Sequence, residues 1–554
     1  MQRRISLIPQ PQQLTAADGD LDLSLLSAIA AAPELHPLAW LLSDLLGRGT
    51  GLRLPVVQST ANDPVEGRVL RLALDGDRPE DFTTAAEAYR LDVTPEGVDL
   101  TAAHPAGIAR GIATLRQLLP ADALREAPAA DPVVPLVRIH DEPRLRWRGV
   151  MLDVVRHFQP KDFVLKMIDR AWLHRLNVVH LHLTDDQGWR FEVPTRPKLT
   201  EIGSWRAETK IGHARDEAAG YEPTPHGGFF SVSDLREIAA YARERHIMIV
   251  PEVNLPGHAR AVLAAYPELG AGQDTAHIDG SQASPKPVCP TFGVFEEVLE
   301  PTQAALDFAL EAYTAIAEVF DGPFIHIGGD EVPMTQWESS PVARELMERE
   351  GMEDVRGVQA WFTRAFCDHL AKMGKRVIGW DEILDGGAPA EAAVQVWRTE
   401  AYVEKALEAG HEVLVSPQTH VYFDHYESDD PSEPLRIHGL TPIEKVAAWD
   451  PAPAGIDEAR ILGVQCQLWS EYLPNPRDVE YAAFPRLAVF AEVAWTNPDV
   501  READPVLDRL SVHLERLHAM GIGYRPLEGP KPWQQGGTGR YRRFDWDFTE
   551  PEVE

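Results

Sequence analysis

The stretch Phe324-Ile-His-Ile-Gly-Gly-Asp-Glu331 decides the fold. Its apolar first half is typical of a short buried strand. The two glycines that follow allow a sharp turn or a close approach of the backbone to a ligand. The turn then presents two adjacent carboxylates, Asp330 and Glu331, whose mutual repulsion should raise the proton affinity of one of them. An isolated Asp-Glu pair is usually only a solvated strand end, so its surroundings decide how it is interpreted.

Seven other short apolar runs occur after residue 140, and several of the intervals hold amphipathic helical patterns, such as Phe163–Leu173 and Leu235–Arg245. Eight β-α units over this length favour an α/β fold, a closed (β/α)8 TIM barrel. In such barrels the loops after the strands form the active face. The eight runs are Gly149–Val155, Val178–Leu183, Ile247–Val253, Phe324–Ile327, Val377–Trp380, Ala393–Trp397, Val413–Val415 and Ile461–Leu468.

The residues before the barrel have a different pattern, which predicts a smaller α+β domain. Tyr89–Val93 and Val98–Leu100 flank a turn and predict a hairpin. Ala106–Leu119 has helical spacing, and the proline- and alanine-rich Ala127–Pro135 is a plausible linker. The expected segments are an N-terminal α+β domain (1–140), the catalytic barrel (141–520) and an irregular C-terminal tail packed on the barrel (521–554).

The bulk composition narrows the class of function. At 554 residues the chain should hold at least two domains, and its 44% hydrophobic and 25% charged residues are typical of a globular protein. A net charge of −33 disfavours nucleic acid and anionic membranes as partners. We see no signal-peptide core before Pro9 and no apolar run long enough to cross a bilayer. The three cysteines are far apart, so a cytoplasmic location is the simplest expectation.

Aromatic and charged side chains gather after the other runs of the predicted barrel. Aromatic faces pack against the apolar faces of sugar rings, and interleaved charged groups supply donors and acceptors for hydroxyls. Any one of these tryptophans alone would more often be a core residue. Together, beside an acid pair, they favour a carbohydrate pocket. The residues are Arg156, Asp185, Trp380, Trp397, Tyr422, Asp424, Trp469 and Glu471.

The acid pair is unusual for a sugar hydrolase, which commonly places two carboxylates on opposite sides of the bond. Asp330 and Glu331 are sequence neighbours and are poorly placed to do this. Either a second acid comes from another strand, or the substrate supplies its own nucleophile, as a 2-acetamido group can. In the second case Glu331 would protonate the leaving oxygen, and an ionised Asp330 would hold the acetamido N–H.

Four long motifs resemble glycoside hydrolase family 20, the β-N-acetylhexosaminidases, and the resemblance extends over almost the whole chain. It implies exo-acting removal of terminal β-linked N-acetylglucosamine or N-acetylgalactosamine with retention, without a metal or cofactor. A small oligosaccharide or glycoconjugate is the implied partner, and the oligomeric state stays open. The motifs are Trp147–Phe158, His180–Arg190, Pro251–His258 and His326–Glu331.

The resemblance also implies individual roles. Glu331 looks like the general acid/base, Asp330 like the carboxylate that orients the acetamido group, and Tyr422 like the hydroxyl that binds its oxygen. The three tryptophans look like walls around the acetamido methyl and the ring. The remaining residues look like contacts to hydroxyls (Arg156, Glu471 and, at the 6-hydroxyl, Asp424) and supports of the acid (Asp185, His258).

One position departs from the family. Asn254 stands where an aspartate usually precedes His258 by four residues. Because a neutral amide cannot stabilise an imidazolium, we expect a lower pKa for His258 than in relatives.

Three other interpretations remain open. His180-Leu-His182 could form part of a metal site, although the later runs offer few further histidines at their ends. A non-catalytic amino-sugar-binding protein could use the same barrel. A two-carboxylate glycosidase could combine Glu331 with Asp185 and would accept sugars that lack the acetamido group.

Overall fold

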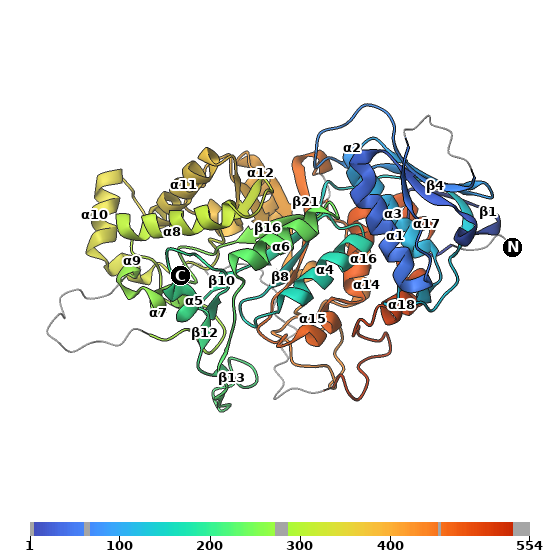
Figure 1. The fold of residues 1–554 in the computed structure, drawn as a ribbon. Coiled ribbons are helices and arrows are strands. Elements are labelled where there is room, and N and C mark those ends of the chain that lie inside the picture. The colour runs from blue at the N-terminus through green and yellow to red at the C-terminus, as the bar shows by residue number, and fades with distance from the viewer. Residues whose placement is uncertain (1–4, 60–66, 272–285, 453–455, 536–554) are drawn as a thin grey trace.

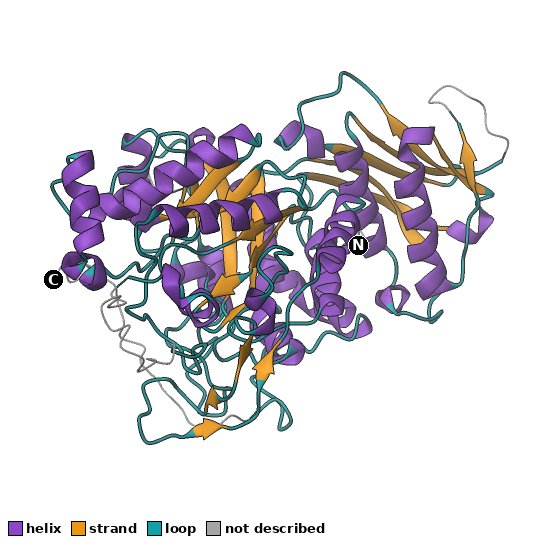
Figure 2. Ribbon diagram, turned by 60° about the vertical axis from the view of Figure 1, so that its left-hand side comes forward, coloured by secondary structure: helices purple, strands orange, loops and turns teal. Residues whose placement is uncertain are grey.

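The larger part of the molecule is a closed barrel of eight parallel strands with helices around it (Figures 1 and 2). The computed structural model describes residues 5–59, 67–271, 286–452 and 456–535. Each of the eight predicted runs forms one strand, which confirms the TIM barrel. In the order of their pairing the strands are β16 (Met248–Glu252), β17 (Phe324–His326), β18 (Arg376–Trp380), β19 (Ala393–Val396), β20 (Val413–Val415), β21 (Ile461–Leu468), β8 (Trp147–Asp153) and β9 (Val178–His182).

Most strands are followed by a helix that packs outside the barrel. Helix α6 (Val232–Arg243) shows how the sequence fixes such an element: Ser231 and Asp234 form a reciprocal capping box, and its apolar residues face inward. Strand β18 differs, because only the short 3-10 helix η5 (Asp381–Leu384) follows it. The main outer helices are α4 (Lys161–Leu173), α6 (Val232–Arg243), α8 (Gln303–Ala317), α11 (Arg356–Lys372), α12 (Glu400–Glu408), α14 (Ile443–Ala448) and α16 (Arg486–Trp495).

A seven-stranded mixed sheet forms the smaller domain before the barrel, with α1 (His36–Thr50) and α3 (Pro105–Leu118) packed on it (Figure 1). The predicted hairpin is present, since β5 (Tyr89–Thr94) and β6 (Gly97–Ala102) pair antiparallel. The prediction of a linker was wrong in its second half, because β7 (Val133–Asp141) starts there and pairs with both β1 (Gln13–Asp22) and β5. The strand order is β1 (Gln13–Asp22), β7 (Val133–Asp141), β5 (Tyr89–Thr94), β6 (Gly97–Ala102), β4 (Val69–Leu74), β2 (Ala28–Ala31) and β3 (Val56–Gln58).

The smaller domain contacts the end of the barrel at which the barrel strands begin. The fully buried Glu87 accepts hydrogen bonds from Arg110 of the small domain (2.6 Å) and from Arg148 (2.7 Å) and Asn177 (3.0 Å) of the barrel. Phe82 packs edge-on against Trp147 at the same end. The opposite end, where the strands finish, is therefore free to form a site.

The chain after α18 (Val506–Ala519) runs without helix or strand as far as Gln535. Arg525 in this segment pairs with Glu433 of the barrel, with Nε and Oε1 2.8 Å apart. The rest of the predicted tail, 536–554, lies outside the described residues. Within the described ranges no helix combines the length and the apolar character needed to cross a membrane.

Candidate active site

The turn after β17 brings the acid pair to the carboxyl end of the barrel. Gly328 and Gly329 have φ angles of +69° and +87°. A Cβ at Gly328 would lie 1.9 Å from Asn254 Oδ1, so only glycine fits there. Glu331 itself has a φ of +50°, a strained conformation for a residue with a side chain. Such strain persists only where the surroundings enforce it and is common at active sites.

Asp330 and Glu331 share one histidine. His258 Nε2 lies 3.5 Å from Glu331 Oε2 and 3.7 Å from Asp330 Oδ2. Burial raises the pKa of Asp330 to about 6, and Glu252, Glu331 and Asp185 add to the increase although His258 opposes it. The side chain of Glu331 is 39% exposed against 12% for Asp330. Glu331 is therefore the carboxyl that faces the solvent of the pocket.

Two carboxylates contact Nδ1 of His258, the ring nitrogen that does not face the acid pair. Its Nδ1 lies 2.9 Å from Asp186 Oδ2 and 3.3 Å from Asp185 Oδ1. Burial alone would lower the pKa of His258, but Asp185, Asp186 and Glu331 together raise it well above its ordinary value. That His258 has a lower pKa than in relatives stays a prediction, but the carboxylates that contact its imidazole are those of Asp185 and Asp186.

Asn254 contacts Asp330 instead. Its Nδ2 donates to Asp330 Oδ1 (2.8 Å), and its Oδ1 accepts from the Gly329 N–H (3.1 Å). The amide thus fastens the turn after β17 and stabilises the ionised form of Asp330. Unlike a carboxyl group, it donates this hydrogen bond at every pH.

Asn254→Asp is therefore expected to make the hydrogen bond donated to Asp330 depend on pH. At low pH the new carboxyl can donate as the amide does, but at higher pH two anions would lie about 2.8 Å apart. The alkaline limb of kcat/KM should move down by about one pH unit, while the acid limb changes little. Profiles of both enzymes measured on one aryl N-acetylglucosaminide test this, and superimposable curves would refute it.

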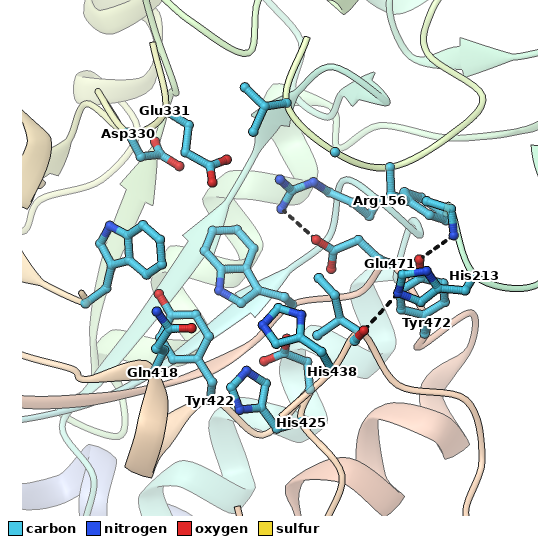
Figure 3. A pocket seen from close by; sticks show the side chains of 18 of the residues that line it. Arg156, His213, Asp330, Glu331, Gln418, Tyr422, His425, His438, Glu471 and Tyr472 are labelled. Carbon is cyan, nitrogen blue, oxygen red and sulfur yellow. Dashed lines mark hydrogen bonds and ion pairs between the residues drawn. The ribbon is translucent and has the colours of Figure 1, made fainter. Parts of the chain in front are cut away.

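Aromatic side chains line one side of the pocket (Figure 3). Trp380 and Trp469 have ring centroids 5.8 Å apart, and Trp397 and Tyr422 stack at 6.3 Å. The indole N–H of Trp397 donates to both oxygens of Glu382 (3.1 Å each), which fixes its orientation. These rings form an apolar enclosure that opens toward the acid pair.

Arg156 and two carboxyls occupy the other side. Arg156 Nη2 lies 2.8 Å from Asp185 Oδ2, its Nη1 lies 4.0 Å from Glu471 Oε1, and its guanidinium lies over the ring of Trp469. Burial raises the pKa of Glu471 to about 7 and that of Asp424 well above its usual range. Asp424 Oδ1 and Glu471 Oε2 have no hydrogen-bond partner within the described part of the chain. Free acceptors in a buried wall are suited to ligand hydroxyls.

The pocket between these two sides has a volume of about 290 Å³, which suits one small ligand. All the residues predicted from the sequence line it except Asp185 and His258, which lie directly behind the lining. The sequence does not predict several contributors from the segments between the strands, because their positions depend on how those segments fold. They include His213, Phe292, Val294, Gln418, His425, Ile437, His438 and Tyr472.

Cation binding also has to be considered for the buried histidines. Three sets of described side chains lie close enough to share a cation. Two include His258, whose nitrogens face the carboxylates described above. In the third, His180 and His326 surround Glu252, which already accepts a hydrogen bond from the indole N–H of Trp380 (2.9 Å).

The barrel, the paired acids and the aromatic pocket define a glycoside hydrolase. The catalytic-domain model of glycosyl hydrolase family 20 matches residues 145–498, and the model of that family's domain 2 matches residues 4–142. The chain belongs to glycosyl hydrolase family 20, and with it to the β-N-acetylhexosaminidase glycosidases.

Individual relatives agree with this assignment. A beta-hexosaminidase of Porphyromonas gingivalis is 35% identical over 98% of this chain, which spans 66% of that protein's length. A beta-N-acetylhexosaminidase of Cellulomonas fimi is 32% identical over 92% of this chain and 93% of its own. The solved family 20 enzyme of Streptomyces coelicolor superimposes with a TM-score of 0.78 at 31% identity, covering 95% of this chain and 98% of that one. A mutant beta-hexosaminidase of Streptomyces plicatus, solved with the product GlcNAc, also has a TM-score of 0.78, at 30% identity, and covers 95% and 97%.

Proposed function

We propose that this protein removes terminal β-linked N-acetylglucosamine or N-acetylgalactosamine from small oligosaccharides or glycoconjugates by substrate-assisted catalysis. The acetamido oxygen attacks C1 while the glycosidic C1–O bond breaks, and Glu331 gives its proton to the leaving oxygen. The resulting oxazolinium is opened when Glu331 takes a proton from water, whose oxygen attacks C1. Two inversions at C1 leave the product with the β configuration of the substrate.

The position of Asp185 supports this route over a two-carboxylate mechanism. Asp185 is 1% exposed, and its Oδ2 lies 2.8 Å from Arg156 and 3.0 Å from His182. Its Oδ1 accepts from the Asp186 N–H at 2.7 Å and faces His258. A carboxylate engaged in this way does not line the pocket and is not free to attack a sugar.

The positions of the other groups in the pocket support the remaining roles. Asp330, ionised above about pH 6, would accept the acetamido N–H and balance the positive charge of the oxazolinium. The Tyr422 hydroxyl would donate to the acetamido oxygen, and the surrounding tryptophans would exclude water. Arg156, Glu471 and Asp424 would bind the hydroxyls at the other side of the ring.

Paired aryl glycosides with one leaving group, with and without the 2-acetamido group, test the mechanism. The sugar without the acetamido group should react at least about 10³-fold more slowly, because the intramolecular nucleophile is lost. A thiazoline analogue of the oxazolinium should inhibit tightly. Equal rates for the two glycosides would contradict the mechanism, and no turnover of either would favour a sugar-binding protein.

A further inference from the structure

A buried row of charged side chains runs beneath the pocket floor, starting at Glu252 at the end of β16. Glu252 is fully buried. Its Oε1 accepts the indole N–H of Trp380 (2.9 Å), and its Oε2 lies 2.5 Å from His182 Nδ1 and 3.0 Å from His180 Nε2. One carboxylate therefore contacts both a wall of the pocket and two histidines of β9.

His182 connects Glu252 to Asp185. Its Nδ1 faces Glu252 Oε2, and its Nε2 lies 3.0 Å from Asp185 Oδ2. Ionised carboxylates only accept hydrogen bonds, so both ring nitrogens must carry a proton, and only the imidazolium has two N–H groups. The pairing of β9 with β16 sets this contact, because Glu252 and His182 are register partners.

The row divides at Asp185. One branch, the hydroxyl arm, passes through Arg156 to Glu471 (2.8 and 4.0 Å). The other, the acid arm, passes through His258 to Glu331 (3.3 and 3.5 Å). Negative and positive groups alternate along both branches, so each charge is compensated by its neighbours.

We propose that Glu252 and His182 are positioning residues that hold Asp185, and through it both arms of the active site. They touch no substrate themselves. Without the imidazolium, Asp185 would lose a hydrogen-bond donor. Such a loss costs a buried charged group far more free energy than an exposed one. Arg156 and His258 would then lose the anion that fixes their positions. The inference rests on the proposed function, since it assigns Glu331 as the acid.

The imidazole of His182 stays protonated over a wide range of pH. Burial would lower the pKa of His182, but Glu252 and Asp185 raise it to about 10, against the repulsion of Arg156. The other groups that face it are His180 on its own strand and the ring of Trp469, 4.9 Å away. The imidazolium therefore persists through neutral pH and is lost only as the pH rises toward about 10.

Glu252→Gln tests the proposal by removing the main charge that stabilises the imidazolium. His182 should then lose its proton between about pH 6 and 9. We expect kcat/KM to fall about 10- to 100-fold at neutral pH, with a new limb from the deprotonation of His182 in addition to the alkaline limb of the wild-type enzyme. Glu87→Gln is the matched control, since it also neutralises a buried carboxylate but at the far end of the barrel. It should lower Tm and leave the pH profile unchanged.

Two variants of His182 provide a second test that does not depend on Glu252. In His182→Gln the side-chain amide nitrogen can take the place of Nε2 and donate to Asp185. In His182→Asn the amide nitrogen takes the place of Nδ1, which faces Glu252. The glutamine variant should therefore keep about tenfold more activity, and neither should show the new limb.

Wild-type pH dependence in Glu252→Gln would overturn the proposal, as would equal activity of the two His182 variants at equal Tm. Stoichiometric zinc in the purified protein, removed by a chelator together with activity, would also overturn it. The acetamido requirement of the wild-type enzyme is measured separately, so a failure of the proposed function is distinguishable from a failure of this inference.

Discussion

Glu331→Gln is expected to lower kcat on N-acetylglucosaminides with poor leaving groups by a factor of about 10² to 10⁴. The amide has nearly the shape of the carboxyl group but cannot give a proton to the leaving oxygen. The side chain is 39% exposed, and its Oε2 lies 3.5 Å from His258 Nε2, so Tm should change little. Steady-state kinetics with a series of aryl leaving groups measures the effect.

The leaving-group series separates an acid role from a purely structural one. A phenol of low pKa departs without protonation, so the variant should recover much of its rate on such a substrate. The wild-type enzyme, which supplies the proton, should show a much weaker dependence on the leaving group. A loss of the same size for every leaving group would mean that Glu331 does not act as the acid.

The barrel could be predicted from the sequence because its strands are buried on both faces and therefore form near-continuous apolar runs. The run Phe324–Ile327 is an example, since β17 is buried at every position. The strands of the small domain were harder to predict from the sequence. The prolines near residue 132 hid the start of β7, and β1 has largely exposed side chains that give no apolar pattern. Local pattern does not reveal strands whose stability comes from their neighbours in the sheet.

The site, too, has features that could be predicted from the sequence and features that could not. Asp330 and Glu331 could be predicted because a chain that leaves a barrel strand must pass the active face. The partner of Asn254 could not, because spacing along the sequence suggested His258, whereas the turns after β16 and β17 bring Asn254 to Asp330. The link between Glu252 and His182 likewise depends on the register of two strands far apart in the sequence. Contacts across strands require the fold, while positions at strand ends do not.

Asp330→Asn is expected to lower kcat/KM on acetamido substrates by about 10²- to 10³-fold, a loss typical of removing one preorganised electrostatic group. The amide fills the same space and can still accept a hydrogen bond through its oxygen, but it carries no charge. The loss therefore reports the charge that faces the oxazolinium. Affinity for a thiazoline inhibitor should fall in parallel, while affinity for the uncharged product should fall less.

The pH profile gives an independent check on Asp330. Its pKa is raised to about 6, so the wild-type enzyme should lose kcat/KM as the pH falls through about 6 and the carboxylate becomes protonated. Asp330→Asn has no such proton to bind, so this part of the acid limb should disappear although the remaining activity is low. Asp424→Asn is the matched control, because it neutralises a carboxyl on the opposite side of the pocket and should retain the limb. If the limb persisted in Asp330→Asn, another group would control the acid side, and the charge that steadies the oxazolinium would have to be sought elsewhere.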